Sequence, residues 1–148
     1  MKANRSVPVV ALGVLLLAAS AALAKDAVGP QESARELSCK NNLRQMGIAI
    51  QVWRTDHDDA LPPDLQTLVD HKYLTIKVLK CPCAKTAAGA LDYRMVKTQG
   101  RTFAEADVVV YDRAGNHAGG RYVLLYNLQV VWLAEEDFKK RMGNEKYE

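Results

Sequence analysis

Three cysteines, Cys39, Cys81 and Cys83, offer the most reactive side chains in this 148-residue sequence. The first 24 residues predict export, and cysteines of exported proteins form disulfides, so we expect Cys39 to pair with Cys81 or Cys83, with the choice between them left open. Such a bond closes a loop of roughly 40 residues and stabilises by about 3 to 4 kcal/mol. Cys81-Pro82-Cys83 is one residue shorter than the Cys-x-x-Cys spacing of dithiol redox sites, which argues against redox catalysis.

A run of acidic residues, Asp56, Asp58 and Asp59, follows the first predicted helix and offers oxygen ligands suited to calcium. The run lacks the Asp-x-Asp-x-Asp-Gly series of a calcium loop. The preferred interpretation is a solvated turn whose carboxylates cap backbone amides. We therefore expect no cofactor, with calcium at these three residues as the alternative.

The histidines, His57, His71 and His117, are the other candidates for acid–base or metal chemistry. None lies in a Gly-x-Ser-x-Gly or His-Glu-x-x-His motif, so we expect a protein that is not an enzyme. His117 is interpreted as a loop imidazole hydrogen-bonded to a nearby strand. A thiol or metal enzyme using Cys81, Cys83 and His117 is the minor alternative.

These residues must be positioned by helices that come first in the chain and strands that come afterwards. A helical period predicts an amphipathic helix over residues 33–55, with an apolar stripe of Leu37, Leu43, Met46, Ile50 and Trp53. Pro62 and Pro63 follow its end, and Asp64 can cap a second helix that ends near His71. Residues 76–79 have a strand-like composition.

Beyond a loop over residues 84–90, alternating apolar residues predict strands over residues 91–97, 107–111, 121–126 and 129–133. A Gly-rich loop, residues 113–120, separates the middle two strands, and a tight hairpin joins the last two. A final helix begins near Ala134, with acidic residues in its first turn. We therefore predict an α+β domain: a long N-terminal helix packed on a small antiparallel sheet, followed by a short C-terminal helix.

The first 24 residues have the composition of a Sec signal peptide: Lys2 and Arg5, an apolar stretch over residues 7–19, and Ala22-Leu23-Ala24 before the cleavage point. This predicts a signal over residues 1–24, a flexible leader over 25–32 and one domain over 33–148, in a periplasmic or secreted protein. The alternative is an inner-membrane anchor formed by residues 7–24. A membrane is an expected partner only in that case.

The balance of charge gives no indication of nucleic-acid binding. The formal net charge is +3, and it falls to about +1 if residues 1–24 are removed. A basic surface able to bind phosphate backbones requires a larger excess of Lys and Arg. We expect no nucleic-acid partner.

Three segments together resemble the head domains of bacterial pseudopilin-like proteins, the prepilin-type proteins related to type II secretion pseudopilins. They are Cys-Lys-Asn-Asn-Leu-Arg-Gln-Met-Gly-Ile-Ala (residues 39–49), Leu-Pro-Pro (61–63) with Cys81-Pro82, and the C-terminal stretch 110–133. Heads of this family often carry a His followed after nine residues by Asp-Gly. The resemblance covers about residues 37–138 and implies a pseudopilin-head-like fold.

The sequence departs from this family in two places. The basic leader, Gly cleavage site and Glu-containing hydrophobic helix of a prepilin are missing, so the resemblance implies a head exported alone that does not polymerise. The matching C-terminal positions are His117, Gly119, Gly120 and Asn127, but Asn127-Leu128 replaces Asp-Gly. Leucine disfavours a positive φ, which predicts a different or strained turn.

The expected function is that of a non-enzymatic structural or adaptor domain. Its partners would be protein components of an envelope, secretion or pilus-like system. The alternative is a soluble extracytoplasmic module that has left the secretion system and binds a peptide or glycan through the hairpin and the Gly-rich loop.

Overall fold

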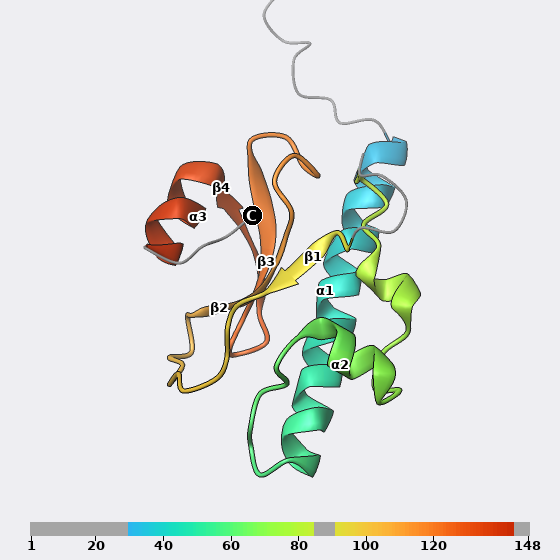
Figure 1. The fold of residues 1–148 in the computed structure, drawn as a ribbon. Coiled ribbons are helices and arrows are strands. Elements are labelled where there is room, and N and C mark those ends of the chain that lie inside the picture. The colour runs from blue at the N-terminus through green and yellow to red at the C-terminus, as the bar shows by residue number, and fades with distance from the viewer. Residues whose placement is uncertain (1–29, 85–90, 144–148) are drawn as a thin grey trace, which may run out of the picture.

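The computed structural model describes residues 30–84 and 91–143, which form an α+β domain (Figure 1). Its elements are α1 (Pro30–Asp56), α2 (Leu65–Asp70), the 3-10 helix η1 (Ile76–Leu79), β1 (Tyr93–Met95), β2 (Val108–Asp112), β3 (Gly120–Leu125), β4 (Val130–Ala134) and α3 (Glu135–Met142). The strands form one antiparallel sheet in the order β1-β2-β3-β4. One long helix, a small antiparallel sheet and a short C-terminal helix were the predicted architecture, and this is confirmed.

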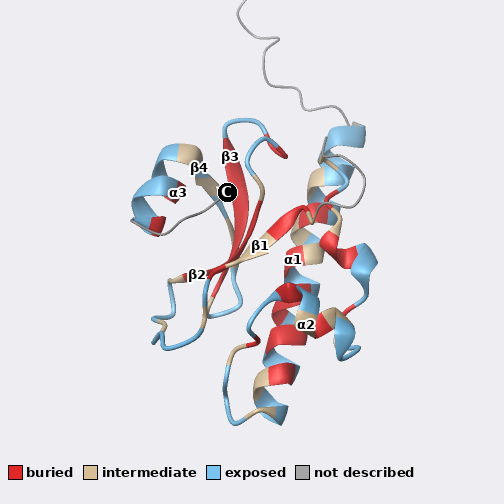
Figure 2. Cartoon of the chain, in the orientation of Figure 1, coloured by how far each residue is buried: buried red, intermediate tan, exposed pale blue. Residues whose placement is uncertain are grey.

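The long helix α1 packs on the sheet, and its buried residues recur along the helix from turn to turn (Figure 2). Leu43, Met46 and Ile50 are buried there, as the helical period predicts. Leu37 was expected in the same stripe but is 55% exposed, and residues 31–38 are all exposed or half-buried. The helix also begins at Pro30 rather than near residue 33, with its proline in the first turn, where no amide donor is required.

The segment between α1 and the sheet differs from the prediction at one point. Asp64 caps α2 by accepting a hydrogen bond from the Thr67 amide at 2.7 Å, as expected. The strand predicted over residues 76–79 is wrong, because Ile76–Leu79 forms a 3-10 helix closed by an amide-to-carbonyl bond from Val78 to Thr75. Val78 and Leu79 are buried against the core. Packing here overrides the β propensity of the branched side chains.

Successive residues of β3 point to opposite faces of the sheet, and each face has its own core. Tyr122 and Leu124 pack with the core that α1 covers, whereas Val123 and Leu125 pack with Phe138 of α3. The sheet therefore lies between α1 and α3 (Figure 1). This places the loops at one end of the sheet beside the N-terminal half of α1.

The hairpin between β3 and β4 is a three-residue loop, in which the Leu128 amide donates to the Leu125 carbonyl and the Leu125 amide to the Gln129 carbonyl. Leu128 has φ of +67°. This is the left-handed position that such hairpins usually give to glycine. Leu128 therefore occupies a backbone region that is costly to an L residue with a side chain, which is the strained turn that Asn127-Leu128 predicts.

Several sequence predictions lie outside the described residues: the signal over 1–24, most of the leader over 25–32, the anchor alternative over 7–24 and most of the loop over 84–90. Within residues 30–84 and 91–143, no helix has both the length and the apolar character needed to cross a bilayer.

Candidate functional site

Three thiols and one imidazole meet at the end of the sheet nearest the N-terminal half of α1. The ligand atoms of Cys39, Cys81, Cys83 and His117 all lie within 4.8 Å of one another. Cys39 belongs to α1, the Cys-Pro-Cys triplet follows η1, and His117 lies in the Gly-rich loop between β2 and β3. Three segments that are distant in sequence therefore supply four groups able to bind a metal ion.

Two of these thiols are presented by a tight turn. The Ala84 amide donates to the Cys81 carbonyl at 2.9 Å, which places Pro82 and Cys83 at the two central positions of a β-turn. Proline favours the first central position because its ring fixes φ there. Cys81 is buried and Cys83 is half-buried, so the turn directs one thiol inward and leaves the other closer to solvent.

A buried carboxylate, Asp92, connects the segments that carry the cluster. Its Oδ2 accepts the Cys81 amide at 2.9 Å. Its carbonyl accepts the Asn116 side-chain amide at 3.2 Å and the Arg113 amide at 2.9 Å. Asp92 therefore fixes the positions of Cys81 and of the loop residue before His117.

A second buried carboxylate, Asp112 at the end of β2, holds the imidazole. Its Oδ2 lies 3.1 Å from His117 Nε2 and accepts the Tyr122 amide at 3.1 Å. The same Nε2 lies 3.7 Å from Cys81 Sγ. Asp112 Oδ1 is buried and has no hydrogen-bond partner among the described residues. This oxygen could therefore accept a further hydrogen bond beside the cluster.

The cluster shifts the pKa values of its thiols in opposite directions. The hydrogen bond from Cys39 lowers the pKa of Cys81 to about 5, opposed by burial and assisted by His117. The same thiol pair, together with burial, raises the pKa of Cys39. Burial raises the pKa of Cys83. Cys81 is thus the thiolate of the group at neutral pH.

The imidazole and its carboxylate also have shifted pKa values. Burial lowers the pKa of His117, but hydrogen bonds to Asp112 and Cys81 and their charges outweigh it, and the pKa rises to about 9. Burial raises the pKa of Asp112, opposed by its hydrogen bond to His117. The cluster therefore holds an imidazolium beside a thiolate when no metal is bound.

A surface hollow of about 980 Å³ opens beside the cluster. Cys83 and His117 line it, together with Asn116, Tyr122 and Trp132. Trp132 is 42% exposed, and its ring lies edge-on to Tyr122 with centroids 4.8 Å apart. The hollow connects the cluster to solvent and presents an aromatic wall on the hairpin side.

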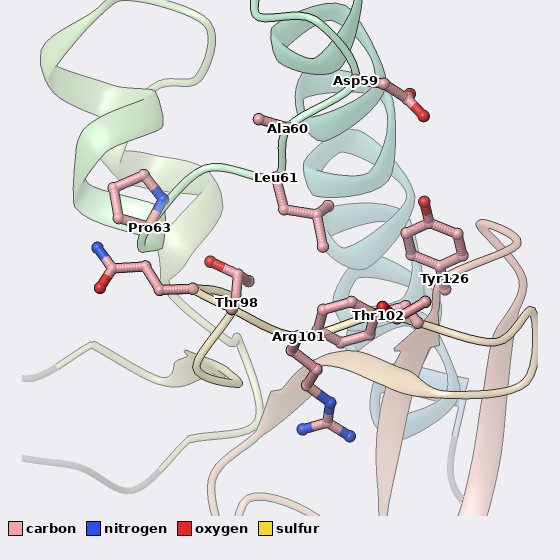
Figure 3. Close-up of a pocket in the computed structure, with 11 residues that line it drawn as sticks. Asp59, Ala60, Leu61, Pro63, Thr98, Arg101, Thr102 and Tyr126 are labelled. Carbon is pink, nitrogen blue, oxygen red and sulfur yellow. The ribbon is translucent and has the colours of Figure 1, made fainter.

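Another hollow, of about 560 Å³, lies at the far end of α1 (Figure 3). Phe103 stacks on Tyr126 there with centroids 5.6 Å apart, and the Arg101 guanidinium lies 4.8 Å from the Phe103 ring. Thr98 donates to the Pro62 carbonyl at 3.0 Å. The described lining of this hollow includes no cysteine or histidine. It therefore has fewer groups able to bind a metal ion or transfer a proton than the thiol cluster has.

The acidic residues considered for calcium are engaged separately. Asp56 accepts the Tyr73 hydroxyl at 2.7 Å, and Asp59 lies 2.6 Å from Arg54. Asp58 and Asp59 both have positive φ in the turn after α1. Among the described residues, the structure does not gather Asp56, Asp58 and Asp59 into a ligand group.

The two other histidines lie away from the cluster. His57 stacks on Trp53 with centroids 3.7 Å apart, and His71 meets the same ring edge-on. The sequence identified each cysteine and His117 as candidates but did not bring all four together. The signal available was the combination of Cys-Pro-Cys with one more Cys and a His in a Gly-rich loop.

The disulfide predicted between Cys39 and Cys81 or Cys83 stays a prediction. All three cysteines are free thiols in the structure. Their proximity is compatible with one disulfide bond or with one metal ion bound by the three sulfurs. The two alternatives use the same sulfur atoms.

Comparison of this chain with protein-family models, curated proteins and solved structures found no match. The resemblance to pseudopilin heads therefore rests on the sequence segments that suggested it.

Proposed function

We propose that this protein is an exported, non-enzymatic structural or adaptor domain, similar to a type II secretion pseudopilin head, that binds another protein of an envelope, secretion or pilus-like system. One observation carries the proposal: aliphatic side chains stand exposed on the outer face of α1. Ile48 is 64% exposed and Val52 is 46% exposed. They lie one helical turn apart on the face away from the stripe that packs on the sheet.

These two side chains form one wall of a groove of about 500 Å³. Tyr73, Leu74 and Val78 line the opposite side, from the segment that follows α2. Covering such a surface contributes about 25 cal/mol for each Å² of apolar area removed from water. The groove is thus suited to the apolar face of a helix or strand from another protein.

The charge around the groove indicates which charge the partner segment should carry. Lys72 is the one charged residue of its described lining, and it is exposed. A matching segment would be apolar, with an acidic residue placed toward Lys72. Nothing in the groove resembles the cluster of basic residues that a nucleic acid requires.

The test is site-specific photo-crosslinking in the envelope of the native host. A photoreactive residue at position 48 should capture a defined protein, whereas one at Lys140, exposed on α3, should not. Ile48→Glu should abolish the capture made from position 52. Leu37→Glu is the matched control, because Leu37 is an exposed aliphatic residue of the same helix outside the groove. Equal capture from positions 48 and 140, or none from either, would contradict the proposal.

A second function is favoured by the hollow beside Trp132, which suits the binding of a peptide or glycan. Exposed aromatic rings are common platforms for such ligands. Asn116 of the Gly-rich loop also lines this hollow. Trp132→Ala and Asn116→Ala should then weaken binding on peptide and glycan arrays. Unchanged binding in both variants would remove this candidate.

A further inference from the structure

We propose that Cys39, Cys81, Cys83 and His117 bind one zinc ion, which cross-links α1 to the Cys-Pro-Cys turn and to the loop between β2 and β3. This inference concerns a site distinct from the groove of the proposed function, so either can fail without the other. It rests on the composition of the ligand set, its geometry and its place in the fold.

The ligand set is that of a structural zinc site. Three thiolates and one imidazole are soft or borderline ligands, which favour zinc over calcium or magnesium. Four protein ligands complete a tetrahedral shell and leave no position for substrate. This closed set agrees with a structural role and with a protein that is not an enzyme.

The distances suit the same ion. With Zn–S of about 2.3 Å and Zn–N of about 2.0 to 2.1 Å, tetrahedral ligands stand about 3.8 Å apart for two sulfurs and about 3.6 Å apart for sulfur and nitrogen. Cys81 Sγ and His117 Nε2 lie 3.7 Å apart, and all four atoms lie within 4.8 Å of one another. Small side-chain movements would bring the remaining pairs to bonding positions.

The surroundings hold the ligands in place before a metal arrives. Asp92 fixes the backbone of Cys81 and the side chain of Asn116, while Asp112 holds the His117 ring. Asp112 Oδ2 and Cys81 Sγ both lie beside the same His117 Nε2, so zinc bound at Nε2 would take the place of this hydrogen bond. Zinc binding replaces the protons that the thiols and His117 carry, so each ion bound releases protons to solvent. The hollow beside Cys83 gives the ion a route inward.

The position in the fold explains why a metal would be useful there. Cys39 is buried, whereas residues 31–38 before it in α1 are exposed or half-buried. Apolar packing against the domain therefore ends at Cys39. A zinc ion at this point would anchor the helix where the hydrophobic core no longer does.

Zinc and a disulfide are mutually exclusive at these sulfurs. Oxidising Cys39 with Cys81 or Cys83 removes two electrons and two protons from the thiols, requires an oxidant such as a disulfide oxidoreductase, and leaves too few thiolates for the tetrahedral shell. The zinc form keeps all three sulfurs reduced. Counting the free thiols and the bound metal of the same sample therefore distinguishes the zinc form from the disulfide form.

The experiment measures zinc and thiols on the protein purified from its native host, by native mass spectrometry and by alkylation before reduction. We expect one zinc per chain and three thiols that zinc protects from alkylation until a chelator removes it. Cobalt(II) substituted for zinc should give the intense thiolate charge-transfer bands and d–d bands of a tetrahedral site. His117→Ala and Cys83→Ser should weaken metal binding at least tenfold, whereas His71→Ala, which alters a histidine outside the cluster, should not.

Circular dichroism identifies any variant that fails to fold. In that case the alkylation and cobalt measurements on the unmodified protein decide alone. A disulfide between Cys39 and Cys81 or Cys83 without metal would overturn the proposal, as would copper in place of zinc or zinc retained at full affinity by His117→Ala.

Discussion

The two ends of the packed part of α1 meet the rest of the molecule through different chemistry. At the Cys39 end these contacts are made by two more thiols, an imidazole and the buried carboxylate that holds the imidazole. At Trp53 they are rings: His57 stacks on the indole, while His71 and Tyr73 meet it edge-on. The first end should respond to metal and oxidant, and the second only to the loss of apolar packing.

The largest effect is expected at the aromatic end. Trp53 is buried, so Trp53→Ala should lower the free energy of unfolding by about 3 to 5 kcal/mol. The indole Nε1 has no hydrogen-bond partner among the described residues, so Trp53→Phe, which keeps a ring, should cost much less. Urea unfolding with and without zinc checks this. If zinc restored the free energy of unfolding that Trp53→Ala loses, the two ends of α1 would not be independent.

Removal of zinc should give the next largest effect, confined to the cluster end. At free zinc 100-fold above its Kd, binding stabilises the folded state by about 2.7 kcal/mol. A chelator should therefore lower the Tm of the unmodified protein by more than that of His117→Ala, which binds zinc more weakly. Hydrogen exchange should increase at the amides near Cys39 and remain unchanged near Trp53. Equal exchange at both ends after chelation would show that the ion does not act locally.

A third region, on the opposite face of the sheet, should depend on pH instead. Arg121 donates from Nε and Nη2 to the two carboxylate oxygens of Glu135 at 2.9 and 2.7 Å, and its guanidinium lies 4.2 Å from the Phe138 ring. This hydrogen-bonded pair lowers the pKa of Glu135 from its ordinary value of 4.5. A lowered pKa in the folded state adds stability above the unfolded-state pKa, and this stability is lost as pH falls through the folded-state value.

Glu135→Gln should thus cost about 1 to 1.5 kcal/mol at pH 7 and progressively less below about pH 4.5. Urea unfolding at pH 7 and at pH 3 measures the difference. Glu136→Gln, at an exposed neighbour in the same helical turn, is the control. A cost that stays constant between these pH values would show that the charge of Glu135 is not what matters.

The same contrast explains how far the sequence could predict the structure. Reasoning from local sequence patterns located α1, the Asp64 cap of α2, the hairpin and α3, because each depends on residues close together in the chain. It missed η1 at Ile76–Leu79, where packing on α1 overrides strand propensity. It also placed Leu37 in the core, because a helical period does not indicate where the packed surface ends.

The cluster shows a different limit. Each of its four residues could be identified from the sequence, yet their meeting depends on how α1, the turn at Cys81 and the loop at His117 converge in space. Contacts between residues so far apart in sequence leave no periodic signal. The two cysteines of the Cys-Pro-Cys turn are too closely spaced for the familiar zinc pattern of Cys-x-x-Cys, and the disulfide prediction came instead from the presence of three cysteines in a chain with an export signal.

The smallest effect is expected for His57, the aromatic-end counterpart of His117. Both imidazoles contact aromatic rings, but His57 stacks on Trp53 at the surface and its Nδ1 lies 2.9 Å from the Trp53 carbonyl. His57→Ala should lower the free energy of unfolding by about 0.5 to 1.5 kcal/mol, the range for a stacked aromatic pair. The zinc content should stay at one ion per chain, whereas His117→Ala loses it. If His57→Ala also released zinc, the two ends of α1 would be coupled, and the division of the helix into a metal-dependent end and a packing-dependent end would be wrong.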